Sequence, residues 1–580
     1  LQGQNQRLED WQGLFPKDWP LADLKGRVTG LDVTLIKDRE GLTFAGEMRP
    51  GGVGGTFAGI EWSDVVGLIT FSDQQVQFYD VAGKLNGQQM SVNGKVLQPM
   101  REPNLQIQLQ AANLDPAAFS PGIPITGHFG VDVKISGVWD ALQAEGKLSV
   151  ASGSINNTWS IDSFSAIVSG SRQKDGWTAR LREGQGVFAG EPLRNLELIL
   201  NRQNGQLLLR TLSAQVGLGS LAAEGILGPD SIDLRVLGAA LPLGALTGNY
   251  PELQATGSLD FTGRVTGMAD AAKVSGRFQA QGGKILSQPF TRAEGMIEFV
   301  GGTVSLDGVE VHNGKGLHQI SGWLALSGNR SLELKIKSKA ARAEDLVALL
   351  APGEPLTGNL ENEVVLGGTL DSIEADGKMT LWEGSYRGYL LTKASGAYRR
   401  AGGIISVDNF VVDSFNAKAN ITGSMDQRKQ LNFNIIAQDV EAAYIQLRYP
   451  YPVQGKLSMN GVLTGSLDKP EFNGEVTSRS LKLNGQDLFD ISGTVVLRRN
   501  EVQVSAVQFL LGKGQVRASG GYRETDSEVY GGLSVENTEV SALLSLLNTP
   551  LSGVSGRLDG QVALTGTTVS PALQLFGTLH

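Results

Sequence analysis

Apolar and polar residues alternate along much of this chain in short runs. Leu105, Ile107 and Leu109, for example, are separated from one another by glutamines. Successive side chains of a β-strand point to opposite faces, so a period of two predicts a strand with one apolar face and one polar face. The same alternation returns at Ile232, Leu234 and Val236, at Leu332, Leu334 and Ile336, and at Leu431, Phe433 and Ile435.

A second kind of strand recurs with glycines at fixed offsets, and its clearest copy is GKLSMNGVLTGSLDKPEFNG, residues 455–474. Five copies begin with a glycine at residues 127, 257, 358, 455 and 556. A second glycine follows ten residues later, at Gly137, Gly267, Gly368, Gly465 and Gly566, and a third follows nine residues after that in four copies and eleven in the last. We call this segment the heading strand.

Large apolar residues occupy the second and eighth positions after the first glycine of every heading strand. Both positions fall on the same face of a strand, because side chains two residues apart point the same way. These residues are Phe129, Leu259, Leu360, Leu457 and Leu558 at the second position and Ile135, Val265, Leu366, Leu463 and Leu564 at the eighth, with Val133 between them in the first copy.

Each heading strand is expected to end in a turn at the second glycine. An aspartate follows three residues later in four copies, at Asp140, Asp270, Asp371 and Asp468, and the fifth copy has Val569 there. An aspartate side chain can accept a hydrogen bond from the backbone just ahead of it and so close a turn. The pattern predicts this role, and a calcium site is disfavoured because the aspartates recur about every hundred residues and not every nine.

The spacing of the heading strands predicts a repeat protein. Successive copies, at residues 127, 257, 358, 455 and 556, start 130, 101, 97 and 101 residues apart. A unit of this kind buries its apolar face only with its neighbours. We therefore divide the chain into a degenerate first repeat at 1–125, repeats at 126–254, 255–355, 356–452 and 453–553, and a truncated repeat at 554–580, all forming one continuous elongated unit.

A single repeat is predicted to hold about six strands and one short helix. The strand-like runs of the repeat 453–553 cover residues 456–465, 471–485, 490–499, 501–511, 514–522 and 528–536. A short helix and a proline follow the last strand of a repeat, most clearly at 344–350 and 540–547. One helix in about a hundred residues is too little to cover the apolar face of the sheet. The sheet either folds into a closed sandwich or solenoid, or curls into a trough that something else fills.

The heading strands GKLSMNGVLTGSLDKPEFNGEV and GNLENEVVLGGTLDSIEADGKM, with the short helix before them, resemble the TamB family. These are AsmA-like subunits of the translocation and assembly module, and the resemblance runs from about residue 80 to the end of the chain. It implies an all-β, taco-shaped groove with an apolar interior, standing in the periplasm of a bacterium with two membranes. It also implies an inner-membrane anchor outside this sequence, phospholipid as cargo and an outer-membrane barrel protein as partner.

We therefore expect a bridge-like lipid transfer protein without enzymatic activity or cofactor, which also has a possible role in outer-membrane protein assembly. The alternating aliphatic residues named above would line the groove. On the pattern alone, the lining of a closed core is the simpler interpretation. Two alternatives stay open: a closed β-solenoid enzyme or adhesin that acts on surface polysaccharide, and a structural tether of the cell envelope.

Composition and net charge limit the partners and the kinds of site that this chain can have. The 76 glycines among 580 residues fit a turn-rich protein, and the net charge of −9 argues against a nucleic-acid partner. There is no cysteine, so disulfides and thiolate sites are excluded. The sequence has no run of eighteen apolar residues, begins with leucine and ends inside a heading strand, so we expect a fragment or processed form with an anchor upstream.

Few residues suggest a conventional active site. The histidines at positions 312 and 318 lie six residues apart in HNGKGLH without a carboxylate cluster, which favours surface positions over a metal site. Glycine-rich stretches at 184–190 and 217–225 lack the spacing of a dinucleotide or phosphate loop. The tyrosines at 444, 449 and 451 either bind a sugar or headgroup or, more commonly for such a group, cap a core. Trp11, Phe15 and Trp19 are expected to cover an apolar end or to continue into a missing neighbour.

Overall fold

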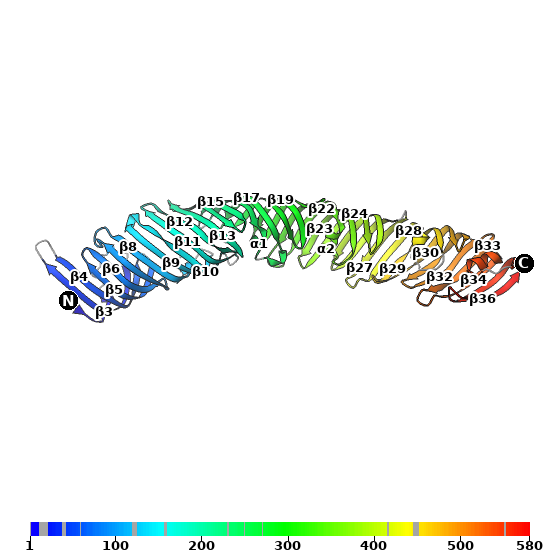
Figure 1. Ribbon diagram of the computed structural model, residues 1–580, viewed down its shortest axis with the longest axis horizontal. Coiled ribbons are helices and arrows are strands. Elements are labelled where there is room, and N and C mark those ends of the chain that lie inside the picture. Colours follow the sequence, from blue (N-terminus) through cyan, green and yellow to red (C-terminus); the bar gives the residue numbers. More distant parts are fainter. Residues whose placement is uncertain are drawn as a thin grey trace. The chain divides into compact units, whose positions relative to one another are not determined.

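The computed structural model describes residues 2–10, 21–37, 42–57, 60–118, 125–155, 159–228, 231–248, 250–268, 271–414, 417–444, 452–549 and 553–580. The chain divides into two compact units, unit 1 (Leu1–Val304) and unit 2 (Ser305–His580). The described residues form thirty-six β-strands and three short α-helices, so the prediction of an all-β fold is confirmed. Figure 1 shows consecutive strands side by side within each unit.

Unit 1 is built from strands that follow one another closely in the chain. They are β1 (Gln2–Gly3), β2 (Gln6–Arg7), β3 (Leu21–Lys37), β4 (Leu42–Phe57), β5 (Ile60–Ser72), β6 (Gln75–Leu85), β7 (Gln88–Leu97), β8 (Asn104–Leu114), β9 (Ile125–Val138), β10 (Gln143–Ile155), β11 (Trp159–Gln173), β12 (Gly176–Phe188), β13 (Glu191–Gln203), β14 (Gln206–Val216), β15 (Gly219–Leu227), β16 (Ile232–Pro242), β17 (Thr256–Gly267), β18 (Lys273–Ile285) and β19 (Gln288–Val300). The unit also has helix α1 (Leu243–Leu246) and 3₁₀ turns at Pro116–Ala118, Trp139–Ala141 and Pro251–Leu253.

Unit 2 has the same construction, and the first two residues of its first strand precede the boundary. Its strands are β20 (Thr303–Asn313), β21 (Gly316–Ala325), β22 (Leu332–Arg342), β23 (Leu356–Thr369), β24 (Ser372–Tyr386), β25 (Tyr389–Ala401), β26 (Ile404–Ser414), β27 (Ala417–Met425), β28 (Leu431–Glu441), β29 (Val453–Ser466), β30 (Lys469–Leu483), β31 (Gln486–Arg498), β32 (Glu501–Leu511), β33 (Gly514–Arg523), β34 (Glu528–Glu539), β35 (Arg557–Gly566) and β36 (Pro571–Leu579). Its helices are α2 (Ala343–Leu350) and α3 (Val540–Leu546), with a 3₁₀ turn at Ala442–Tyr444.

The strands pair antiparallel with their neighbours in the chain. In unit 2, for example, β23 pairs with β22 on one side and with β24 on the other. The six runs predicted for the repeat 453–553 correspond to β29, β30, β31, β32, β33 and β34, and the predicted helices at 344–350 and 540–547 are α2 and α3. Connections are tight turns within a repeat, so each repeat is a meander that closes with a helical segment.

The recurring glycines have two separate structural roles. Gly455 and Gly465, the first and second glycines of β29, have φ angles of 115° and 82°, which L-residues with a side chain rarely adopt. Gly474 has an ordinary φ, but a Cβ there would clash with the carbonyl oxygen of Asn460 on the paired strand. The first two glycines therefore permit bends, and the third permits close backbone approach.

Bulges interrupt the pairing at corresponding places in successive repeats. In the heading strand β29 the register shifts between Gly455 and Ser458, and in the strand before it, β28, the register shifts between Ala437 and Val440. A bulge bends its strand and increases its twist. Four of the five strands that precede heading strands, β28 included, carry a residue with a left-handed φ at the bulge, namely Ala240, Ala340, Asp439 and Asn537. Each repeat is thus bent at the same positions.

The helices cover only part of the apolar face. Leu543 and Leu544 of α3 pack into a buried cluster with Val516, Val535 and other residues of the neighbouring strands. Leu350 of α2 joins a second cluster, and Leu246 of α1 packs on a third in unit 1. These clusters are the best-filled parts of the fold, and they lie where a helical segment follows the last strand of a repeat.

Candidate functional site

The residues predicted to line a groove all lie on the covered side of their strands. Six of them are buried: Leu332, Leu360, Leu366, Leu431, Leu457 and Leu558. The others are half-buried: Leu105, Ile107, Leu109, Phe129, Val133, Ile135, Ile232, Leu234, Val236, Leu259, Val265, Leu334, Ile336, Phe433, Ile435, Leu463 and Leu564. Most of this apolar face is therefore shielded from water without being fully packed.

The structure brings the two predicted sets of residues together. The last full strand of a repeat pairs with the next heading strand, and residues from the two sets stand directly opposite each other. Ile107 faces Ile135, Leu234 faces Val265, Leu334 faces Leu366, and Phe433 faces Leu463. In the last copy the register places Gly531 opposite Leu564, so an apolar pair is replaced by a glycine and a leucine.

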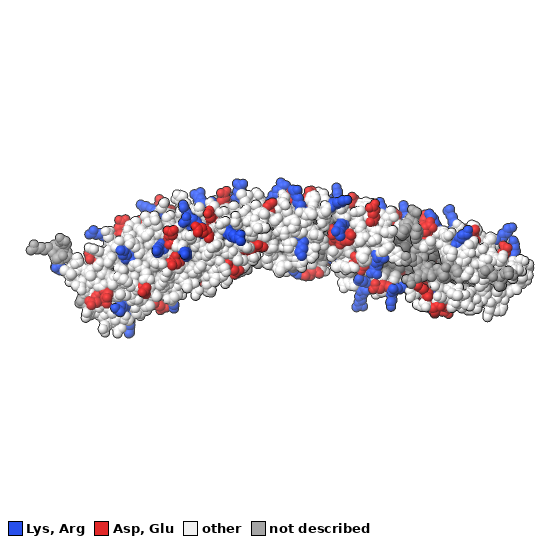
Figure 2. All heavy atoms as spheres, in the orientation of Figure 1, with Lys and Arg blue, Asp and Glu red and all other residues white. Residues whose placement is uncertain are grey.

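The opposite faces of the same strands are exposed and mostly polar, although Leu237, Val365 and Ile436 also lie exposed on them. On β22 the side chains of Glu333, Lys335 and Lys337 are exposed, while Leu334 and Ile336 between them are half-buried. On the face that Figure 2 shows, acidic and basic residues are interspersed over both units. Charge of this kind is typical of a solvated surface.

A polar pair interrupts the apolar face beneath α2. The hydroxyl of Tyr398 on β25 donates a hydrogen bond of 2.9 Å to Oδ1 of Asn362 on β23. Both residues are buried, at 8% and 6% exposure. Burial raises the pKa of the Tyr398 hydroxyl to about 12, because the phenolate would lose its hydration. The pair satisfies both polar groups and carries no charge at neutral pH.

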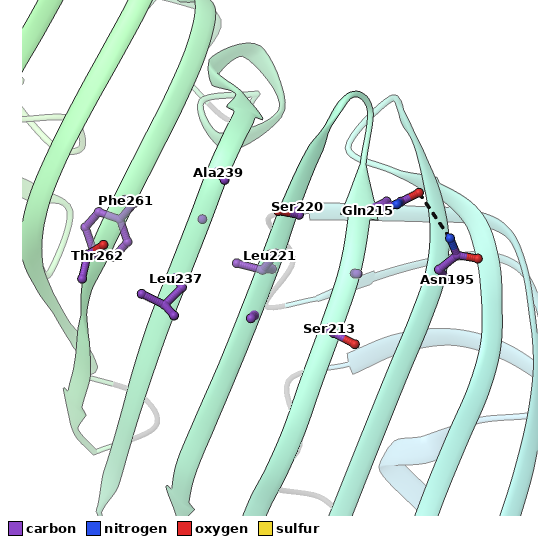
Figure 3. A pocket seen from close by; sticks show the side chains of 12 residues that line it. Asn195, Ser213, Gln215, Ser220, Leu221, Leu237, Ala239, Phe261 and Thr262 are labelled. Atoms are coloured by element: carbon purple, nitrogen blue, oxygen red, sulfur yellow. Dashed lines mark hydrogen bonds between the residues drawn. The ribbon is translucent and has the colours of Figure 1, made fainter.

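An open pocket of about 370 Å³ lies on β13, β14, β15, β16 and β17 of unit 1 (Figure 3). Its lining combines small and apolar residues with neutral polar groups, and Asn195 donates to Gln215 at its edge. The complete lining is Asn195, Ser213, Ala214, Gln215, Ser220, Leu221, Ala222, Leu237, Gly238, Ala239, Phe261 and Thr262. None of these residues is an acid, a base or a metal ligand of the usual kinds, so the lining lacks the groups for acid–base catalysis.

Antiparallel strands of unit 2 end alternately at two borders of the sheet. One border, which we call the helix border, carries α2, the start of β23 at Leu356 and the turn between β24 and β25. The other, the glycine border, carries the turn that follows each heading strand and the turn between β27 and β28. The full length of a strand separates the two borders.

Four charged residues join these two borders. Glu354 and Arg387 lie at the helix border, before β23 and in the turn after β24, and Lys429 and Asp468 lie in turns at the glycine border. Lys429 Nζ is 2.7 Å from Glu354 Oε1, and Arg387 Nη1 is 3.3 Å from Asp468 Oδ1. Arg387 Nη2 also lies 3.3 Å from Glu354 Oε2. We call these four residues the clasp.

Glu354 is the best-buried member of the clasp, with 11% of its side chain exposed. Burial alone would raise the pKa of its carboxyl group. Hydrogen bonds from Lys429, Tyr386 and Arg387 and the charge of Lys429 outweigh burial and hold this pKa below its ordinary value. Tyr386 contributes its hydroxyl, which donates to Glu354 Oε2 over 3.1 Å. No local pattern predicts the clasp, because its members are up to 114 positions apart, from 354 to 468.

In the third, fourth and fifth copies the turn after the heading strand is closed by a hydroxyl group and not, as predicted for the third and fourth, by the aspartate. The backbone N–H of Ser372 donates to Thr369 Oγ1, and that of Lys469 donates to Ser466 Oγ, each over 3.2 Å. Asp371 instead accepts from Arg330 over 2.6 Å, and Asp468 belongs to the clasp.

In the fifth copy the N–H of Ser570 donates to Thr567 Oγ1 in the same way. This turn therefore closes without an aspartate, and a valine can occupy that position. Asp140 lies in a 3₁₀ turn, and Asp270 is outside the described residues. The turn glycines at 137, 267, 368 and 465 all have positive φ, as a bend at these positions requires.

The remaining candidates form no recognisable catalytic or metal site. His318 Nδ1 lies 2.8 Å from Ser338 Oγ, and burial lowers the pKa of its imidazole. In the described segments no group of three or more metal-ligating side chains comes together. The side chains of Tyr444, Tyr449 and Tyr451 lie outside the described residues, as do Trp11, Phe15 and Trp19. Among the helices that are described, none has the length and apolar character needed to cross a bilayer.

Comparison with known proteins adds no identification. No protein-family model matches the chain, and no curated protein matches its sequence.

Proposed function

We propose that this chain is a non-enzymatic lipid conduit, whose sheet curls into a groove that holds acyl chains between the inner and outer membranes of a bacterial envelope. The observation that carries the proposal is the partial burial of the side chains on the apolar face. Side chains such as Leu334, Phe433 and Leu463 point to the covered side of their strands, yet they are only half-buried, and even Leu334, which packs against the buried cluster beneath α2, keeps part of its surface uncovered. Such a surface suits an apolar occupant.

The clasp supports a curled sheet in unit 2. The strand β25 has 13 residues, so a flat sheet would separate the two borders by roughly 43 Å at about 3.3 Å per residue. Lys429 and Glu354 nevertheless form an ion pair from opposite borders. The bulges that recur in successive repeats supply the bending that brings the borders together.

The energetics favour acyl chains as the occupant. A phospholipid with about thirty methylene groups would lose roughly 24 kcal/mol on transfer of its tails to water, at ~0.8 kcal/mol for each group. A groove with an apolar interior and a slit to water keeps the tails buried while the headgroup stays hydrated. A lipid that moves along the groove passes from one site to a similar one. The supply of lipid at one end therefore sets the direction of net transport.

The antiparallel meander argues against one alternative. A parallel β-helix stacks successive rungs in parallel, whereas consecutive strands here run in opposite directions. A structural tether with a closed interior has the same topology as a conduit, so the two differ in what fills the interior. The periplasmic location, the inner-membrane anchor and an outer-membrane barrel partner belong to the proposal through the TamB resemblance.

Photo-crosslinking in living cells tests what fills the interior. A benzophenone side chain at Leu334, Phe433 or Leu463 should give lipid adducts. The matched positions are the exposed neighbours Lys335, Asn434 and Thr464, whose side chains point to the other face. These three should give no adducts above background. Equal labelling of both sets, or none at either in a protein with intact β-structure, would contradict the conduit and leave the tether.

A further inference from the structure

The clasp occurs at one place in unit 2, around the repeat 356–452, and the corresponding positions of the neighbouring repeats do not form it. Arg330 and Asp371 occupy, one repeat earlier, the positions of Lys429 and Asp468, and they pair with each other on a single border. One repeat later the same positions hold Ser527 and Val569, which carry no charge. At the helix border the repeat before has Leu253 and Leu286 in place of Glu354 and Arg387. The four charges thus coincide only around the repeat 356–452, where they bridge the two borders.

The two cations of the clasp are accessible to a ligand. The side chain of Lys429 is 53% exposed, and that of Arg387 is 34% exposed. Asp468, which holds Arg387, is 78% exposed, so water reaches this ion pair and weakens it. Guanidinium and ammonium groups bind phosphate as readily as carboxylate, and the planar guanidinium offers paired donors to either.

We propose that the clasp spans the slit of the unit 2 groove, and that the phosphate of a lipid headgroup inserts between the two borders and widens the slit, with Arg387 of the helix border and Lys429 of the glycine border binding the phosphate in place of Asp468 and Glu354. This inference rests on the proposed lipid conduit. A headgroup that moves along the slit meets the clasp as a barrier, because the tails travel inside and the phosphate outside. The phosphate supplies the negative charge that the two cations lose when the carboxylates leave, so no unpaired cation is left behind.

The distance between the borders reports the state of the clasp. The chain has no cysteine, so two introduced cysteines can be spin-labelled without interference. Leu390 at the helix border and Arg428 at the glycine border are exposed and close in sequence to the clasp residues. We would label L390C/R428C in the full chain and measure the distance distribution by pulsed electron resonance.

Three probes separate the sources of phosphate. Dihexanoyl phosphatidylglycerol should shift the distribution to longer distances. Dihexanoylglycerol, which has the same tails and no phosphate, should not shift it. Inorganic phosphate at the same concentration should cause at most a small shift, because it lacks the tails that hold the headgroup at the slit. A full shift with inorganic phosphate would identify a free-anion site and overturn the headgroup assignment.

Variants provide the second readout. E354Q/D468N should give the long distance without any lipid, and R387Q/K429Q should give it as well and no longer respond to the phospholipid. E471Q removes the partner of Arg498 on the glycine border alone, at 2.9 Å, and should leave the distance unchanged. Short distances in E354Q/D468N would show that something other than the clasp holds the borders together.

The lipid conduit and the clasp fail in different ways. If benzophenone at Phe433 yields lipid adducts while the phospholipid leaves the border distance unchanged, the clasp is a permanent strut, and this inference is wrong while the conduit stands. If Phe433 yields no adducts, the conduit is wrong. The border distance then still shows whether phosphate displaces the carboxylates.

Discussion

The Nζ atom of Lys429 lies 2.7 Å from Oε1 of Glu354, although these residues are 75 positions apart and sit at opposite borders of one sheet. No tight turn or hairpin brings them together. In the proposed groove their contact depends on the bending of the strands between them, so the clasp is a sensitive measure of the proposed curl of unit 2.

Acid should open the clasp. The pKa of the Glu354 carboxyl group is lowered in the folded protein, so its ion pairs stabilise the folded state fully above the ordinary carboxyl value of about 4.3. This stabilisation is lost as the pH falls from there through the lowered pKa. The L390C/R428C distance should lengthen over this range. E354Q has already lost the Lys429 pair, so its distance should be longer at neutral pH and should change less over the same acid range.

Two neighbouring glycines test whether the turn after β23 needs a residue with a left-handed backbone conformation. Gly368 has a φ of 83°, and a Cβ there would clash with the carbonyl oxygen of Ser372. A Cβ on Gly367 would meet open space. We expect G368A to destabilise the β23–β24 hairpin by at least about 1–2 kcal/mol and G367A to have little effect. Hydrogen exchange of the hairpin amides would measure both, and equal protection in the two variants would refute the assignment.

The hydroxyl of Thr369, and not the carboxylate of Asp371, should stabilise the turn after β23. T369V removes the acceptor of the Ser372 N–H and should cost about 0.5–1.5 kcal/mol. D371N breaks an ion pair whose carboxylate is 73% exposed, and exposed pairs contribute about 0–1 kcal/mol. Proteolytic cleavage within this turn should therefore accelerate more in T369V than in D371N. The reverse order would restore the aspartate to the role that the sequence suggested.

The buried Tyr398–Asn362 pair should show strong coupling. Y398F leaves Oδ1 of Asn362 buried without its donor, which costs about 1–3 kcal/mol. Replacement of both partners, in N362L/Y398F, removes the unsatisfied group and should recover most of this loss. Urea unfolding of the full chain, followed by circular dichroism, would compare the midpoints. Additive losses in the double variant would mean that the two side chains do not depend on each other.

The local elements of the fold were predictable because their signals are local. A period of two and the paired glycines are each contained within one strand, and the run 501–511 coincides with β32. The helix predicted at 344–350 differs from α2 by one residue at its start. These features depend on side-chain alternation and on backbone angles, which the residue types specify directly.

The clasp and the closure of the turns were not predictable in the same way. Ala340 has a φ of 48° at the bulge that bends β22, and alanine gives no sequence signal for such an angle. The bend at such a bulge therefore cannot be read from composition, and neither can a long-range contact such as Glu354–Lys429. At the turns, Asp371 and Thr369 were both able to accept the backbone hydrogen bond. The neighbouring Arg330 attracts the carboxylate and leaves the turn to the hydroxyl.

The residues that bend a heading strand lie within that strand, so the sequence of one repeat specifies the bends of that repeat. Duplication or loss of a whole repeat would lengthen or shorten a unit by six strands, roughly 29 Å at about 4.8 Å per strand. The apolar faces of the other strands would keep their orientation. Removal of a single residue would turn the remainder of that strand over and place its aliphatic side chains in water. Gain or loss of whole repeats would therefore change the length of a unit in large steps, whereas a small insertion or deletion inside a strand would disrupt its apolar face.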